Sequence, residues 1–389
     1  MNLRLQHSPS GRVVRVGQRE SAYWAFVPHP LPPQMEITIE LVRVLSDADR
    51  AIGELNGLGH RLPSPHILIS PFIRKEAVLS SRIEGTQASI ANLYAYEAGQ
   101  ASLPITEPAA PESDVHEVQN YVLALEYGLE RLATLPVSRR LMRELHERLM
   151  TGVRGNSATP GEFRRSQNWI GTPGYTLDGA LYVPPPVDEM ETSLNAFEQY
   201  LHADDTYPPL VRLAFIHYQF EAIHPFLDGN GRIGRLLIIL LLVHWDLLRQ
   251  PLLYLSGYFE QHRQMYYDLL LGVTERGNWR EWVEFFLRGV VEQAHDAAQR
   301  VIRLQDLQAD WHRRLDRARS SALTLRLADS LFGSPFLTVP IAQRMLSVTY
   351  RGAHGIVQRL LEASILKPVN GASYGRWFVA QEILTAIEA

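Results

Sequence analysis

The fold and the chemistry of this chain are decided by one stretch, HPFLDGNGRIGR at residues 224–235. Gly229, Asn230 and Gly231 can adopt a positive φ, so their backbone N–H groups can converge on one anion. The apolar run 236–242 follows at once and predicts a buried helix, whose N-terminus adds its dipole and unpaired N–H groups at the same place. The stretch therefore predicts an anion site at the start of a helix.

Four charged or titratable side chains surround this predicted anion site. Arg232 and Arg235 lie three apart, on one face of the first turn, where cations oppose the helix dipole unless an anion lies between them. Asp228 offers the hard oxygen ligand that Mg²⁺ prefers. His224 carries an imidazole, whose ordinary pKa is close to neutral and suits a general base. Together they favour a nucleotide-dependent transfer in which a triphosphate binds.

Working outward, apolar residues recur with helical spacing through most of the chain. Ser70-Pro71 predicts a helix start, with Ser70 as the N-cap and Pro71 at the first helical position. The ranges with helical spacing are 35–52, 71–99, 113–133, 138–150, 190–203, 209–223, 230–247, 261–276 and 280–318. Residues 102–111 are rich in Pro and Ala and predict a linker.

Two β-hairpins are expected in this mostly helical chain. Asp178-Gly179 lies between the β-prone runs 175–177 and 180–183, before the prolines at 184–186. In the tail, two short helices at 341–346 and 352–363 precede strands at 367–369 and 376–379 around Asn370-Gly371. A helix, turn, helix and small hairpin is the order of a winged helix.

The composition narrows the classes of protein further. The 389 residues suggest two or three domains, 46% are hydrophobic, and the formal net charge is −4, so no general basic field draws the chain to nucleic acid. The absence of cysteine excludes disulfides, thiolate zinc sites and cysteine nucleophiles. No apolar segment of signal-peptide length opens the chain, and 236–243 is far shorter than the roughly 20 residues that span a bilayer. We therefore expect a soluble, cytoplasmic protein without a membrane partner.

The stretch 224–235 resembles, at every defining position, the signature of Fic-domain proteins, His-Pro-Phe-x-Asp/Glu-Gly-Asn-Gly-Arg-x-x-Arg. Fic proteins typically transfer AMP from ATP to a hydroxyl of a target protein. The resemblance implies that His224 deprotonates the target hydroxyl, that Asp228 binds Mg²⁺ and that Phe226 packs in the core. It further implies a phosphate site, formed by Gly229, Asn230, Gly231, Arg232 and Arg235. Because Gly231 is kept, the chain resembles the nucleotidyl-transferring branch of the family and not the kinase-like one.

Two other segments carry the same resemblance. Residues 160–171 resemble the stretch upstream of the Fic flap, and the hairpin after them would be the flap itself, which aligns the target by strand addition. The flap residues would be Tyr175, Leu177, Leu181 and Tyr182. Ser80-Ser81-Arg82-Ile83-Glu84-Gly85 resembles the Fic inhibitory motif. In that case Glu84 would pair with Arg235 in place of the γ-phosphate, with Ser80 four residues before it on one helical face.

Residues 258–267 resemble the helix that closes the adenosine pocket, so Tyr258 and Tyr266 are possible nucleotide contacts, although aromatic residues there are more often core. The implied fold is mainly α, with a helical Fic core, a β-hairpin flap, an N-terminal helical region and a C-terminal winged helix. The expected domains are 1–111, 112–300 and 301–389. The expected partners are ATP, Mg²⁺ and a target protein with a hydroxyl side chain, with self-modification and a homodimer as further options.

Two alternatives stay open at this point. His217, Glu221, His224 and Asp228 fall at helical intervals and could form the metal site of a hydrolase. The chain could also be a DNA-binding regulator that reads DNA with its tail, roughly residues 320–389. Several polar and basic residues of the tail could face a groove of the DNA. These are Gln343, Arg344, Arg351, His354, Gln358, Arg359 and Arg376.

Overall fold

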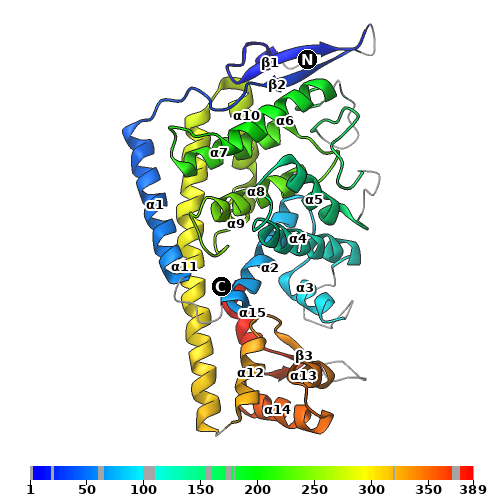
Figure 1. Cartoon of the computed structure of the whole chain (residues 1–389), viewed down its shortest axis with the longest axis vertical. Coiled ribbons are helices and arrows are strands. Elements are labelled where there is room, and N and C mark those ends of the chain that lie inside the picture. Colours follow the sequence, from blue (N-terminus) through cyan, green and yellow to red (C-terminus); the bar gives the residue numbers. More distant parts are fainter. Residues whose placement is uncertain are drawn as a thin grey trace. The chain divides into compact units, whose positions relative to one another are not determined.

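The computed structural model describes residues 3–18, 22–59, 65–99, 110–153, 159–171, 177, 180–318, 320–369 and 377–388. Within these ranges the chain is mainly α-helical, as expected, with two small antiparallel sheets (Figure 1). It divides into two compact units. Unit 1 comprises Met1–Gly53, Leu123–Leu248 and Leu255–Gln293, and unit 2 comprises Glu54–Val122, Arg249–Tyr254 and Ala294–Ala389.

Unit 1 is built around two consecutive buried helices, α7 (Pro209–Ile223) and α8 (Asn230–His244), which pack on each other. Their residues are apolar on nearly every side, as expected for helices at the centre of a unit. The surrounding helices of this unit are α5 (Arg139–Met150), α6 (Val187–His202), α9 (Ser256–Gln261) and α10 (Arg263–Arg276). Ser138 caps α5 by accepting the N–H of Leu141, which confirms the expected helix start.

The N-terminal part of unit 1 holds a hairpin that the sequence analysis missed. A 3-10 helix, η1 (Leu3–His7), precedes strands β1 (Gly11–Val16) and β2 (Tyr23–Pro28), which pair antiparallel from Gly11–Pro28 to Val16–Tyr23. Strand β2 packs on α6 and α7 (Figure 1). The buried residues Ala25, Phe26 and Val27 attach the strand to the helical core.

Three long helices cross the division between the units. These are α1 (Ile39–Gly59), α4 (Glu112–Arg131) and α11 (Trp279–Arg317). The last two match the expected ranges closely, whereas α1 begins four residues later than expected. The amphipathic periodicity of these three helices allowed them to be predicted from the sequence.

The N-terminal part of unit 2 differs from the expected single helix over 71–99. Helix α2 (Pro65–Ile83) begins six residues earlier and contains Pro71 in its interior, so Ser70-Pro71 is not a helix start. Burial of Ile69, Phe72 and Ile73 on either side of the proline holds the helix together there. After α2, Gly85 takes a φ of 104° and ends the run, and α3 (Ile90–Glu97) starts with a capping box at Ser89.

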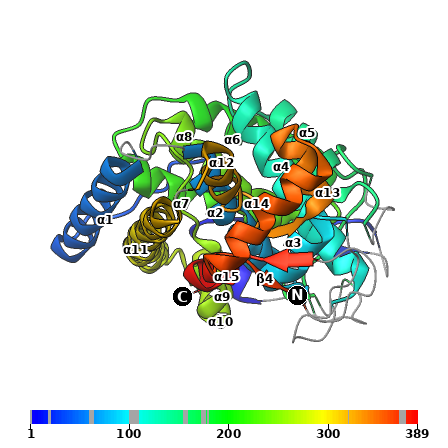
Figure 2. The same cartoon turned by 90° about the horizontal axis from the view of Figure 1, so that it is seen from below.

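The C-terminal part of unit 2 contains α12 (Ala322–Ser330), β3 (Phe336–Thr338), α13 (Val339–Leu346), α14 (Tyr350–Glu362), β4 (Lys367–Pro368), β5 (Trp377–Val379) and α15 (Gln381–Glu388). The strands form one sheet in the order β3-β5-β4, and α13 packs on α14 and α12 (Figure 1, and from below in Figure 2). The expected helices and strands of the tail are thus present, while its expected turn at Asn370-Gly371 and Arg376 lie outside the described residues.

The expected flap hairpin is only partly within the described residues, since Tyr175 and the turn at Asp178-Gly179 lie outside them. The expected strand over 180–183 is reduced to one bridge, in which Ile170 and Tyr182 exchange backbone hydrogen bonds of 2.8 and 3.1 Å. The three prolines that follow cannot donate to a ladder, which limits the strand. The linker over 102–111 also falls almost wholly outside the described ranges.

No helix among the described residues is long and apolar enough to cross a membrane. The division at 1–111, 112–300 and 301–389 stays a prediction.

Candidate active site

Helix α7 ends at Ile223, and its C-cap residue His224 opens the motif loop (residues 224–229). His224 has φ 50° and ψ 60°, the left-handed conformation, and its N–H donates to the Phe220 carbonyl at 3.0 Å. Its Nδ1 lies 3.3 Å from the Glu221 carbonyl oxygen. Because a carbonyl oxygen can only accept, this contact places a proton on Nδ1, and in the neutral ring the lone pair is then on Nε2. The imidazole is half-buried.

The motif loop leads directly into α8, and only one of its three expected left-handed residues is left-handed. Gly229 has a φ of 79°, whereas Asn230 and Gly231 are the first two residues of α8. The Gly229 N–H is taken by Asp228 Oδ1 at 2.6 Å. The three backbone N–H groups that were expected to converge on one anion therefore do not form a separate loop site. The candidate anion site is the N-terminus of α8, where the first N–H groups have no intrahelical acceptor.

The side chain of Asn230 braces the motif loop from within. Its Oδ1 accepts the Phe226 N–H at 2.8 Å, and its Nδ2 donates to the Phe226 carbonyl, also at 2.8 Å. The residue is 2% exposed. A phosphate contact from Asn230 is thus left to its main chain.

Arg232 and Arg235, the expected phosphate ligands, are both buried, at 3% and 2% exposure. Arg232 Nη2 lies 3.8 Å from Asp228 Oδ1 and 3.7 Å from Met150 Sδ. Arg235 lies close enough to His217 for its charge, after burial, to lower the pKa of that imidazole, which is about 3. Two guanidinium groups inside a protein are costly unless anions meet them.

Phe226 is fully buried, as the resemblance implied, in a stack that α5 completes. The ring of His146 lies on it with centroids 3.8 Å apart, and Phe163 packs from another side at 5.1 Å. The Gly161 N–H donates to His146 Nδ1 at 3.0 Å, so Nδ1 carries no proton and Nε2–H donates to the Asp228 carbonyl at 3.1 Å. Burial lowers the pKa of His146 to about 4, which keeps it in this neutral form.

Residues 164–168 hold the carbonyl oxygens of the first three residues of the motif loop. Arg164 Nε donates to the His224 carbonyl at 3.0 Å, and the Arg164 N–H donates to the Pro225 carbonyl at 2.9 Å. Asn168 Nδ2 donates to the Phe226 carbonyl at 2.7 Å and lies 3.4 Å from the His224 carbonyl. These contacts turn the loop carbonyls toward the protein, where they do not oppose a bound anion.

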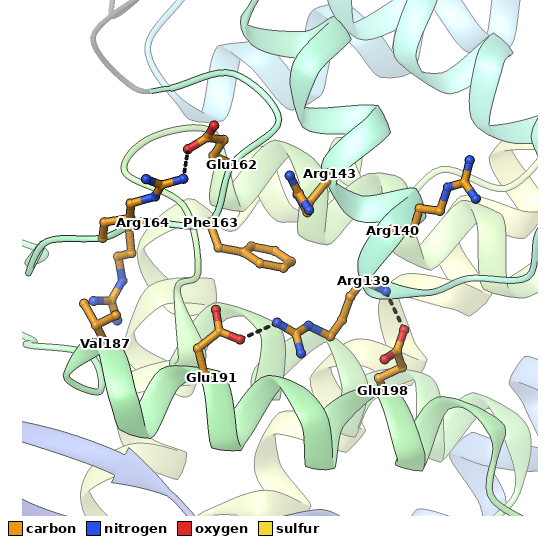
Figure 3. Close-up of a pocket in the computed structure, with 10 residues that line it drawn as sticks. Arg139, Arg140, Arg143, Glu162, Phe163, Arg164, Val187, Glu191 and Glu198 are labelled. Carbon is orange, nitrogen blue, oxygen red and sulfur yellow. Dashed lines mark hydrogen bonds and ion pairs between the residues drawn. The ribbon is translucent and has the colours of Figure 1, made fainter.

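A cavity of about 530 Å³ is lined by Phe163 and by residues of α5 and α6. Figure 3 shows Phe163 at its centre, with Arg139 and Arg143 reaching in from α5 and Glu191 from α6. Arg139 lies over the Phe163 ring at 5.3 Å and pairs with Glu191, and Arg143 Nε donates to the Gly161 carbonyl at 2.7 Å. The cavity is therefore lined by arginines that already have acceptors, and it adjoins the motif loop through Phe163.

Asp228 is the residue that the resemblance assigns to Mg²⁺. Its side chain is 55% exposed and lies beside the start of α8. Mg²⁺ is often held by one protein carboxylate together with phosphate oxygens of the substrate, so the side chain of Asp228 fits that ion.

The hydrolase alternative is not supported. Helix α7 stops at Ile223, so the four residues of the stripe do not share one helix, and His217 Nε2 is bonded to the Tyr266 hydroxyl at 2.9 Å. Across the described ranges, no three His, Asp or Glu side chains are grouped so that they could hold a metal ion.

The flap residues face different ways. Tyr182 is buried beside Phe26, and its hydroxyl donates to the Ala222 carbonyl at 2.6 Å, whereas Leu181 is 54% exposed. Leu177 is half-buried, and Tyr175 lies outside the described residues. Tyr182 thus anchors the end of the flap to the last turn of α7.

Tyr258 and Tyr266 lie in the aromatic core of unit 1. Tyr266 is 1% exposed and stacks on Phe259 at 4.6 Å, while Tyr258 is 7% exposed and packs on Phe285 at 4.9 Å. Neither ring presents an open face, so the structure favours the core role over stacking on a base.

Ser80 and Glu84 do not share a helix face. Ser80 is fully buried within α2, whereas Glu84 is exposed in the turn that follows, its N–H donating to the Ser81 carbonyl at 3.0 Å. Glu84 belongs to unit 2 and Arg235 to unit 1, and their pairing stays a prediction.

Sequence reasoning missed His146, Arg164 and Asn168. Arg164 and Asn168 fall in the segment 160–171 that resembles the family, which was a usable signal. His146 lies on an ordinary amphipathic helix, and nothing local marks it. The contacts of all three are tertiary, so spacing does not reveal them.

Comparison with known proteins agrees with the resemblance. The family model described as Fic/DOC family N-terminal matches residues 42–130, and that of the Fic/DOC family matches 136–242, together about half of the chain. A protein adenylyltransferase Fic from Aedes aegypti is 31% identical over 216 residues, and one from Culex quinquefasciatus is 30% identical over 216 residues. Each alignment covers 52% of this chain but only 37% of the relative.

Two solved structures share the fold. A Fic family protein from Desulfovibrio desulfuricans G20 matches with a TM-score of 0.56 and 21% identity, covering 90% of this chain and 98% of that one. A Fic domain containing signaling protein from Bacteroides thetaiotaomicron VPI-5482 matches with a TM-score of 0.51 and 16% identity, covering 66% and 96%. With its motif loop at the start of α8, this chain belongs to the Fic/DOC family.

Proposed function

We propose that this chain is a protein adenylyltransferase, which moves AMP from ATP to a serine, threonine or tyrosine hydroxyl of a target protein. The observation that carries the proposal is the placement of His224 at the end of α7, one short loop before the N-terminus of α8, whose first turns hold Arg232 and Arg235. The curated relatives named as protein adenylyltransferases support the same activity.

In this reaction His224 is the general base. With the ring proton on Nδ1, which lies 3.3 Å from the Glu221 carbonyl, Nε2 takes the proton of the target hydroxyl. The hydroxyl oxygen then attacks the α-phosphorus of ATP. The bond from that phosphorus to the bridging oxygen breaks, and pyrophosphate leaves with the electron pair.

The phosphates are bound at the N-terminus of α8. The main-chain N–H groups of its first turn and the positive end of the helix favour a polyanion there. Arg232 and Arg235 add two positive charges in a region from which water is largely excluded, where their attraction to phosphate is strong. In this proposal Asp228 holds Mg²⁺, which neutralises phosphate charge when bound.

The acceptor side of the site is the flap. Leu181 is the exposed flap residue within the described part, and a target segment that pairs with residues near it would bring its hydroxyl toward His224. Self-modification is included in the proposal, and intact-mass analysis without added target tests it. A homodimer is a separate prediction, to be checked by light scattering.

We further propose an inhibitory role for Glu84, which lies in the turn after α2. A carboxylate that meets the Arg235 guanidinium would occupy the place of the γ-phosphate and keep ATP from binding productively. Ser80, buried one turn earlier in α2, would fix the position of the inhibitory segment.

The absence of cysteine supports a cytoplasmic location.

A second candidate activity is DNA binding by the tail, which we propose to be a winged helix. Helix α14 buries Ala353, Val357 and Leu360 and leaves Arg351 and Arg359 exposed on its other side. A basic helix face of this kind suits a major groove. Fluorescence anisotropy with duplex DNA should show affinity that falls with salt, and Arg351→Glu should weaken it; no binding at low salt would exclude this activity.

The adenylyltransferase proposal is tested with ATP labelled either at the α- or at the γ-phosphate. Label should enter protein only from the α-position, and pyrophosphate should be released in equal amount. Incorporation from the γ-position would indicate a kinase, and incorporation from neither would remove the proposal.

A further inference from the structure

The backbone of His224 is held in a conformation that its side chain disfavours. Its φ of 50° is in the left-handed region, which a residue with a Cβ enters only at a cost in free energy. Such a conformation persists where surrounding contacts determine it. The contacts at His224 include hydrogen bonds that its carbonyl oxygen accepts from Arg164 and Asn168.

Arg164 makes the decisive contacts. Its three guanidinium nitrogens all donate to main-chain carbonyls, Nε to His224 at 3.0 Å, Nη1 to Ser166 at 3.3 Å and Nη2 to Pro185. Its own N–H donates to the Pro225 carbonyl at 2.9 Å. One residue therefore fixes two successive peptide units of the motif loop against the segment that follows the flap.

We infer that Arg164 is a positioning residue for His224, which sets the left-handed backbone and so the direction of the imidazole. The planar guanidinium presents donors in a fixed fork, a geometry that lysine cannot reproduce. Arg164 is 1% exposed, and burial lowers its pKa to about 10, so it remains charged near neutral pH and donates charge-assisted bonds. Asn168 acts in the same way but with the weaker, neutral amide.

The kinetic test rests on the proposed function and uses two variants with a matched control. Arg164→Lys keeps the charge but loses the fork, and it should lower kcat at least about tenfold while KM for ATP stays within about threefold. Arg164→Met should cost about 10²-fold in kcat, the usual effect of a misplaced catalytic group. The neighbouring Arg165, 85% exposed and paired with Glu162 at 2.9 Å, supplies the control Arg165→Met, which should keep the kcat of the unmodified enzyme.

A second measurement does not depend on activity. Amide hydrogen exchange of residues 226–229 should be at least about tenfold faster in Arg164→Lys than in Arg165→Met, with exchange in α7 and α8 unchanged. If the unmodified protein transfers no AMP, the proposed function fails, and this exchange result alone decides the inference.

Two results would overturn the inference. One is an Arg164→Lys enzyme with the kcat and the loop exchange of the unmodified protein. The other is a variant in which kcat and ATP binding both fall by the same fraction as the amount of folded protein. That result would mean that Arg164 has a purely structural role. Should Arg164→Met fail to fold, Asn168→Ala replaces it, with an expected loss in kcat of about three- to tenfold from one lost donor.

Discussion

The imidazole of His146 lies face to face on the ring of Phe226, with centroids 3.8 Å apart and planes inclined by 7°. The same imidazole accepts from Gly161 and donates to the Asp228 carbonyl, so one neutral tautomer serves both contacts. Helix α5 thereby holds the motif loop through a ring contact and a hydrogen bond. The neutral state of His146 is therefore a condition for the shape of the site.

This condition predicts a dependence of stability on pH. Burial lowers the folded-state pKa of His146 to about 4 and that of His217 to about 3, below the ordinary value of 6.5. Between these values the unfolded chain binds more protons, so stability is present above pH 6.5 and is lost as the pH falls toward 4. From pH 7 to pH 5 each residue should contribute a loss of about 2 kcal/mol in the free energy of unfolding.

Urea unfolding at the two pH values measures this loss. His146→Gln should reduce it by about 2 kcal/mol, because the variant has no proton to take up. The control His295→Gln changes an exposed histidine and should leave the loss as it is. An unchanged loss in His146→Gln would mean that His146 titrates normally in the folded protein.

Gly229 is predicted to be irreplaceable at the start of α8. Its φ is 79°, and an added Cβ would lie 3.0 Å from Met150 Sδ and 3.4 Å from Leu149 Cδ2. Gly229→Ala should cost about 1–2 kcal/mol of stability from the backbone alone, and it should weaken ATP binding by shifting the helix N-terminus.

The matched control for this change is Gly53→Ala in α1, where an added Cβ meets nothing within 4 Å. It should raise stability by about 0.5–1 kcal/mol. Thermal unfolding with and without ATP compares the two. Equal effects of the two substitutions would show that the loop does not require a left-handed residue at position 229.

Glu84 is predicted to restrain the enzyme. Glu84→Gly removes the carboxylate proposed to meet Arg235, and it should raise AMP incorporation at least about tenfold, the value of a charged hydrogen bond. Incorporation of α-labelled ATP is the readout, with Glu54→Gly, another exposed acidic residue, as the control. An unchanged rate in a Glu84→Gly protein that still binds ATP would remove inhibition from the proposal.

Much of the fold was predictable because helix periodicity is a local property. The pattern over 209–223 reproduced α7 residue for residue, and Ser138 marked the start of α5. The prediction at Ser70-Pro71 was wrong because packing around Ile69 and Phe72 outweighs the preference of proline for a first turn. The valine-rich run Gly11–Val16 and the aromatic run Tyr23–Pro28 carried a strand signal that was overlooked.

The site was predictable only where it is contiguous. His224, Asp228 and Gly229 stand together because they follow one another in the chain. The burial of Arg232 and Arg235, and the capture of the Gly229 N–H by Asp228, depend on how α8 packs and how the loop closes. His146 and Arg164 reach the loop from positions 82 and 60 residues away, and no sequence spacing encodes such contacts.

The central claim is that His224 activates a hydroxyl for attack on ATP, and one comparison tests it most directly. Purified protein and its His224→Ala variant are incubated with ATP and Mg²⁺, with and without a target protein, and intact masses are recorded. The unmodified chain should add one AMP per acceptor, and the variant should be slower by about 10²- to 10⁴-fold while binding ATP equally well. AMP transfer at the normal rate by His224→Ala would contradict the assignment of the base.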